Sequence, residues 1–179
     1  MPRTFRDYIT LAGCAAILAV VVTALVLALG RALLLVILLA VGVLVGIIGF
    51  RRARQRALIR RFHNQFAPPK DLLLVFTASP HWLPRVEQEW LPRWADRAVL
   101  FNRSGSWSAQ QVEAKLWRTF GGFVEHTPLA VVLPRRGNPS VVRFFLAFRD
   151  FKHGKPARLL KAEQDLEAAL AAAIDSDAA

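Results

Sequence analysis

Three side chains in the second half of the chain have the chemistry of an acyl-transfer or acid–base site. Ser79 carries a hydroxyl, and His81 and His126 carry imidazoles that exchange a proton near neutral pH. A serine within hydrogen-bond reach of a histidine could act as a nucleophile. Two ordinary loop histidines would give the same pattern, and this interpretation is favoured. A hydrolase or transferase is therefore the alternative hypothesis for this chain, with Ser79, His81 and His126 as its candidate catalytic residues.

Other common site chemistries are absent from the sequence. The single cysteine, Cys14, excludes an intramolecular disulfide, a CxxC redox pair and a cysteine-based zinc site. The four histidines are scattered without HxxxH or HExxH spacing, and neither GxxxxGK nor GxGxxG occurs. We therefore expect no metal and no cofactor.

The elements that would position the three side chains form one small α/β domain over residues 70–174. Apolar runs predict four strands, at 71–78, 98–102, 129–133 and 141–148. The short turn between the last two makes them an antiparallel hairpin. Helical periodicity predicts three helices, the first starting near Pro84 and broken or kinked by Pro92, the second after Gln111, and the third at 159–174. We expect residues 175–179 to be a disordered tail.

The predicted order is βαβαββα in one mixed sheet, with a right-handed first crossover. His81 follows the first strand and His126 precedes the third, so their loops should meet at one edge of the sheet. Such an edge, next to a helix N-terminus, often binds small anions. This placement is the structural basis of the alternative enzyme hypothesis.

In topology, residues 71–174 resemble the thioredoxin-like fold. Val75 to Ala78 end a first strand and lead into a helix, and Thr127 and Pro128 stand where that fold usually has a cis-proline. The positions of the redox cysteines of that family are occupied by His81, Trp82, Leu83 and Pro84. Thiol–disulfide chemistry is therefore excluded, and the resemblance implies a fold and no activity.

A second resemblance is carried by residues 148–156, which read FRDFKHGKP. This segment is similar to one in bacterial two-span membrane proteins of no assigned function. For this chain it implies only a structural role, with a turn at Gly154 and a polar pair formed by Arg149 and Asp150.

Two apolar stretches, residues 9–29 and 32–50, precede the domain, and each is long enough to cross about 30 Å of hydrocarbon. Only Gly30 and Arg31 separate them, so we expect residues 1–50 to form a helical hairpin that turns there. Gly42 and Gly46 form a GxxxG motif that would let the two spans pack closely or let two copies dimerise. A signal peptide cleaved near Gly30 is the alternative.

Basic residues follow the second apolar stretch. Six arginines within residues 51–61, with Arg3 and Arg6 before the first span, predict that both termini are cytoplasmic. Residues 51–66 read as a basic amphipathic helix whose Leu58, Phe62 and Phe66 would lie on the anionic leaflet. A simple stop-transfer charge is an equal alternative. A proline hinge within residues 51–69 would end this segment. The arginines expected at lipid headgroups are Arg51, Arg52, Arg54, Arg56, Arg60 and Arg61.

The net charge of +11 is unevenly distributed. Residues 1–69 hold nine arginines and one acidic residue, whereas residues 70–179 hold fifteen basic and twelve acidic residues. Because the positive charge flanks the membrane segment, nucleic-acid binding is not predicted. The excess of arginine over lysine is typical of a bacterial protein from a GC-rich genome, and we expect a two-pass protein of the inner membrane.

Five tryptophans lie in the soluble part, more than one small core requires. Trp90 and Trp117 are expected in the core, whereas Trp82 and Trp94 are candidates for the membrane interface or a partner surface. Together with the strong anchoring and the lack of catalytic motifs, these residues favour a membrane-anchored interaction or scaffolding module. Its expected partners are anionic lipids and another membrane protein or a second copy of the chain.

Overall fold

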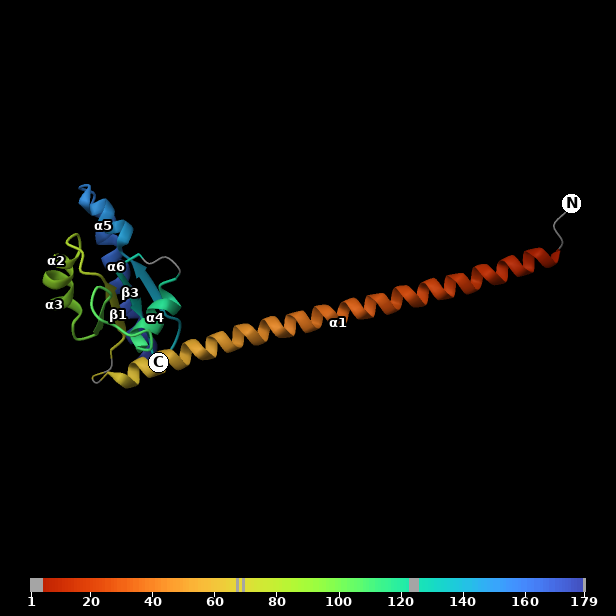
Figure 1. Cartoon of the computed structure of the whole chain (residues 1–179), viewed down its shortest axis with the longest axis horizontal. Coiled ribbons are helices and arrows are strands. Elements are labelled where there is room, and N and C mark those ends of the chain that lie inside the picture. The colour runs from red at the N-terminus through yellow and green to blue at the C-terminus, as the bar shows by residue number, and fades with distance from the viewer. Residues whose placement is uncertain (1–4, 67, 69, 123–125, 179) are drawn as a thin grey trace. The chain divides into compact units, whose positions relative to one another are not determined.

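The computed structural model describes residues 5–66, 68, 70–122 and 126–178 of the chain (Figure 1). The chain divides into two compact units, Met1–Arg52 and Ala53–Ala179. The second unit is a mixed α/β domain, as predicted. It includes the last turns of the N-terminal helix, which the sequence pattern assigns to a separate juxtamembrane segment.

Helix α1, Phe5–Gln65, continues through Gly30 and Arg31, so the turn expected there is not seen. The flanking alanines and leucines are strong helix formers, and one glycine costs a helix only about 1 kcal/mol. The expected turn follows from the limited thickness of a bilayer, so it is required only when the helix is inserted in a membrane. Among the described residues, one helical segment, Val36–Gln65, is long and apolar enough to span a membrane. Residues 36–50 of this segment are all exposed.

The sheet has four strands in the order β2-β1-β3-β4. Strand β1, Leu72–Phe76, pairs in parallel with β2, Ala98–Asn102. Strand β3, Leu129–Val132, is antiparallel both to β1 and to β4, Ser140–Arg143. All residues of β1 and β3 are buried, as expected of central strands covered on both faces.

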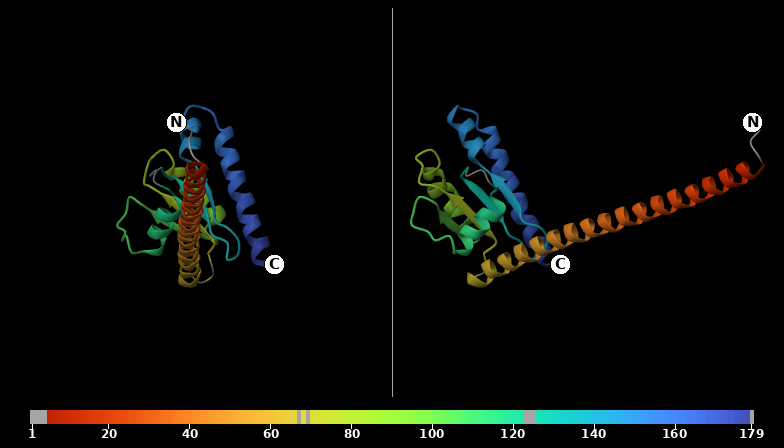
Figure 2. Two further views of the ribbon diagram at one scale, coloured as in Figure 1. Left: turned by 90° about the vertical axis from the view of Figure 1, so that its right-hand side faces the viewer. Right: turned by 45° about the vertical axis from the view of Figure 1, so that its right-hand side comes forward.

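Helices cover both faces of this sheet (Figure 2). The face formed by Leu72, Leu74 and Phe76 packs against the helices that follow β1 and β4. The opposite face packs against α4, Val112–Phe120, and against the last turns of α1. There Phe62 has an exposed fraction of 0%, and the side chains of Leu58 and Phe66 are partly buried beside it.

The predicted lipid-facing role of Phe62 is therefore wrong. Its four-residue spacing with Leu58 and Phe66 correctly indicates an apolar helix face, but that face packs on the sheet. Burial on β1 and β3 removes the ring from solvent as completely as burial in lipid would, so periodicity cannot separate the two environments.

The first helical region after β1 is continuous and changes its hydrogen-bonding pattern along its length. It consists of α2, Leu83–Arg85, a π-helical turn, Val86–Trp90, and α3, Leu91–Trp94. The backbone N–H of Leu91 donates to the carbonyl of Val86, one residue beyond the α-helical partner. Because Pro92 has no N–H to donate, the wider turn before it replaces the predicted break.

The prediction of a strand at 141–148 is wrong beyond Arg143. Residues Phe145–Lys152 form helix α5, so the order becomes βαβαββαα. Phe144 and Phe148, four residues apart, are both buried, and the N–H of Phe148 donates to the carbonyl of Phe144 at 2.8 Å. A short apolar run fits a strand and a buried helix equally well by periodicity, which explains the error.

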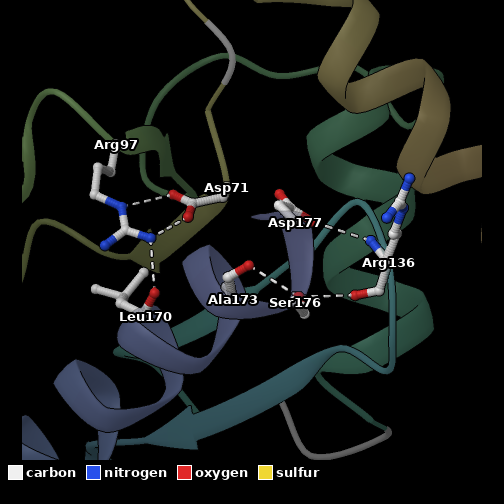
Figure 3. A network of polar contacts seen from close by, with 7 residues as sticks. All are labelled: Asp71, Arg97, Arg136, Leu170, Ala173, Ser176 and Asp177. Atoms are coloured by element: carbon white, nitrogen blue, oxygen red, sulfur yellow. Dashed lines mark hydrogen bonds and ion pairs between the residues drawn. The ribbon is translucent and has the colours of Figure 1, made fainter. Parts of the chain in front are cut away.

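Helix α6, Ala157–Ala178, extends past the end predicted from the sequence, so the expected disorder is wrong for residues 175–178, and residue 179 lies outside the described residues. Leu159, Leu166, Leu170 and Ala173 are buried on one face of it, as predicted. Its last turn is tied to the β3–β4 turn, because the hydroxyl of Ser176 donates to the carbonyl of Arg136 at 3.2 Å. This contact gives the acidic C-terminal residues a fixed place (Figure 3).

Candidate functional sites

The loops that carry Ser79, His81 and His126 meet at one edge of the sheet, as expected from the strand order. The hydroxyls of Thr77, after β1, and Thr127, before β3, are hydrogen-bonded at 3.3 Å. The bond between Thr127 and Pro128 is cis, at the position that the thioredoxin-like resemblance indicates.

A row of four rings crosses this edge, formed by His81, Trp82, Phe145 and His126, and we call it the aromatic row. The imidazole of His126 stacks on Phe145 with centroids 4.3 Å apart and planes 7° from parallel. Trp82 lies edge-on to Phe145 at 6.3 Å, and His81 lies 6.4 Å from Trp82. The indole N–H of Trp82 donates to the carbonyl of Thr77 at 2.9 Å, which fixes the centre of the row.

The geometry of the edge does not pair a nucleophile with a base. The Ser79 hydroxyl accepts a hydrogen bond from the backbone N–H of His81 at 3.4 Å, and in the described part of the chain neither imidazole bonds to it. His81 and His126 are exposed and stand at opposite ends of the aromatic row, separated by Trp82 and Phe145. The catalytic roles of these residues stay predictions.

A cavity of about 510 Å³ lies at the opposite edge of the sheet, where the turn after β3 faces the last turns of α1. Helix α1 and the turn each contribute arginines to its wall. We call it the basic cavity, and its lining residues are Arg56, Ile59, Arg60, His63, Asn64, Pro134, Arg135, Arg136 and Gly137.

Helical spacing places the α1 residues of the basic cavity on one face. Arg56, Arg60 and His63 follow one another at intervals of four and three residues, which bring side chains to the same side of a helix. Buried Ile59, between the two arginines, packs against the sheet and orients this face.

The turn that forms the other wall is held by α6 (Figure 3). The backbone N–H of Arg136 donates to the carboxylate of Asp177 at 3.1 Å, and its carbonyl accepts from Ser176. Gly137 adopts a φ of +92°, which favours glycine over other residues. The guanidinium of Arg136 extends from this fixed backbone toward α1.

The charged residues that line the basic cavity are all basic among the described residues. Among the described residues, none that lines the cavity is acidic, and none of its four arginines has an ion pair. Both ring nitrogens of His63 are shielded from solvent and lack a hydrogen-bond partner in the described part of the chain. A wall with several cationic donors and no carboxylate among the described residues is suited to an anion.

The basic cavity combines predicted and unpredicted residues. All six arginines expected at lipid headgroups are exposed, but only Arg56 and Arg60 line the cavity. Sequence reasoning missed Arg135 and Arg136, because the segment RRGNP signals only a turn. It also missed His63, which has no recognisable motif around it in α1.

The glycines of the predicted packing motif lie on an open stretch of α1. A methyl group added at Gly42 or Gly46 would have no described atom within 4 Å outside the helix itself. The close helix contact that the GxxxG spacing favours is therefore not seen among the described residues. The role of Gly42 and Gly46 in packing or dimerisation stays a prediction.

The tryptophans differ partly from expectation. Trp90 and Trp117 are buried, as predicted, but Trp94, expected at a surface, has an exposed fraction of only 4%. It follows Trp90 by one helical turn, and their rings lie 5.6 Å apart, so both join the same core. Trp82 is partly buried in the aromatic row, and its role at a membrane interface or a partner surface stays a prediction.

Metal-ligand side chains are not gathered in the part of the chain that the structure describes. There, no cluster of three or more His, Cys, Asp or Glu side chains could hold a metal ion.

Comparison of the chain with protein-family models, curated protein sequences and solved structures gives no match.

Proposed function

We propose that this chain is a two-span protein of the bacterial inner membrane whose α/β domain binds another protein of that membrane from the cytoplasmic side. The observation that carries the proposal is the aromatic row, with an exposed imidazole at each end and large rings between them. Aromatic side chains held rigidly at a surface are enriched among the residues that dominate protein interfaces.

The membrane part of the proposal is supported by length and charge. Residues 9–50 would form about 60 Å of helix, twice the thickness of the hydrocarbon layer. In a bilayer the chain therefore reverses at Gly30 and Arg31 and gives two spans. The exposed arginines after Phe50 keep the α/β domain on the cytoplasmic side.

We also propose a thioredoxin-like topology without the redox cysteines for the α/β domain. The strand order and the antiparallel placement of β3 between β1 and β4 support it. Helices on both faces of the sheet agree with this topology. A shared fold carries no activity, so it leaves the binding function as the leading proposal.

Single cysteines test the two-span topology. In a Cys14→Ser background, Arg31→Cys is expected to react with a membrane-impermeant maleimide in intact cells, because the turn faces outward. Thr4→Cys and Asn138→Cys should react only after the membrane is opened. Labelling of Thr4→Cys from outside, with Arg31→Cys protected, would show a single crossing and contradict the proposal.

Photo-crosslinking tests the binding surface. A photoreactive amino acid at His81 or His126 is expected to yield the same protein adduct in native membranes, because both positions flank the aromatic row. The matched control is Gln164, which is also exposed but lies on α6. Adducts are detected by gel shift and mass spectrometry. The proposal fails if positions 81 and 126 yield no adduct, or if position 164 yields the same one.

A further inference from the structure

We propose that the basic cavity is a binding site for a phosphate monoester, carried by a lipid headgroup or by a small organic phosphate. This inference goes beyond the proposed function and concerns the opposite edge of the sheet. It depends on neither the aromatic row nor a protein partner. It rests on the convergence, charge, size and rigidity of the cavity wall.

Arginines from two distant segments converge on the basic cavity. Arg56 and Arg60 belong to the arginine cluster that follows the apolar segment, and stop-transfer charge alone would account for them. Arg135 and Arg136 lie in the connection between β3 and β4, far along the chain, and have no part in setting membrane orientation. Their placement on the same cavity as Arg56 and Arg60 therefore needs another explanation.

Charge defines the ligand. Four arginines line one cavity and their positive charges repel one another, whereas a bound anion attracts all four. A phosphate monoester carries a charge of about −1.5 to −2 near neutral pH and offers three strong acceptor oxygens. One guanidinium group can donate two parallel hydrogen bonds to two such oxygens. His63 adds two ring nitrogens that have no hydrogen-bond partner among the described residues. A single carboxylate would leave most of these donors unused.

Size indicates that the phosphate is attached to an organic group. The volume of about 510 Å³ falls in the range of small-molecule sites and exceeds what one phosphate fills. Ile59 and Pro134 are buried and supply apolar surface beside the arginines. A glycerol phosphate, free or as the headgroup of phosphatidic acid, has the required combination of charge and carbon.

Rigidity of the turn favours binding. The backbone of Arg136 is fixed on both sides by Ser176 and Asp177, and Gly137 sets the direction of the chain after it. The guanidinium groups of the turn are thus presented from a backbone that is already ordered, which lowers the entropic cost of capturing a ligand.

The test uses the full-length protein in phosphatidylcholine nanodiscs, with two probes that separate the sources. Glycerol 3-phosphate, titrated by calorimetry, reports a soluble phosphate. Phosphatidic acid, added to the nanodiscs and counted by native mass spectrometry as retained lipid, reports a headgroup. We expect binding of at least one probe. Absence of both would overturn the proposal.

Matched variants distinguish the cavity from diffuse attraction to positive charge. Arg135→Gln with Arg136→Gln should weaken binding about tenfold or more for each arginine removed. Lys152→Gln with Lys155→Gln removes the same charge from exposed positions outside the cavity and should leave binding unchanged. Equal weakening by both pairs would overturn the proposal. If the turn variant unfolds, Arg56→Gln with Arg60→Gln must give the same loss from the helix wall.

Discussion

Replacement of Glu163 by alanine is expected to lower the free energy of unfolding of the α/β domain by about 1 to 3 kcal/mol. The Glu163 carboxylate on α6 is buried and accepts hydrogen bonds from Arg85 Nε at 2.9 Å and from Trp90 Nε1 at 2.8 Å. Truncation leaves the buried indole N–H of Trp90 without its acceptor and takes one carboxylate from Arg85, which keeps its ion pair with Glu89 at 2.9 Å. Removal of one partner from a buried charged network costs more than the network contributes.

The measurement is tryptophan fluorescence during urea unfolding of the full-length protein in detergent. All five tryptophans lie within the α/β domain, so the signal reports that unit alone. The matched control is Glu167→Ala on the same helix, where the ion pair with Arg93 is about half exposed. We expect this control to lose at most about 1 kcal/mol. Similar losses for both variants would contradict the assigned role of Glu163.

Replacement of Phe62 by alanine is expected to destabilise the α/β domain by about 3 to 5 kcal/mol. Phe62 belongs to the last turns of α1, yet it has no exposed surface and packs with buried residues of β1 and β3. Its loss leaves a cavity beneath the helix. The same fluorescence experiment measures the effect.

The control for Phe62 is Leu160→Ala, because Leu160 is 51% exposed on α6. We expect a change within about 0.5 kcal/mol for this surface substitution. A loss below about 1 kcal/mol for Phe62→Ala would restore the interpretation in which this helix face contacts lipid and the domain begins after residue 69.

Strands β1 and β2 can be predicted from the sequence because their signals are local. The run at Leu72–Phe76 is wholly apolar, and Ala98–Asn102 is a short apolar run within turn-forming neighbours. The closing helix is recognisable from Leu159, Leu166 and Leu170, which recur at helical spacing. Burial of β1 on both faces and of one face of α6 produces these patterns directly.

The remaining features depend on contacts between distant segments. Helix α5 and the second half of the predicted fourth strand share one apolar run, and packing of Phe144 and Phe148 decides between them. The basic cavity requires α1 and the β3–β4 turn to meet, which no local pattern encodes. The strand order predicts that His81 and His126 share one edge, but no sequence signal predicts the stacking of His126 on Phe145.

The ordered end of α6 has a practical consequence for work with this protein. Ser176 and Asp177 contact the backbone of Arg136, which lines the basic cavity. An affinity tag or fluorescent fusion joined directly to the C-terminus would crowd that wall, and an acidic tag would compete for its arginines. Protein prepared for ligand screening should therefore carry its purification handle before the first residue.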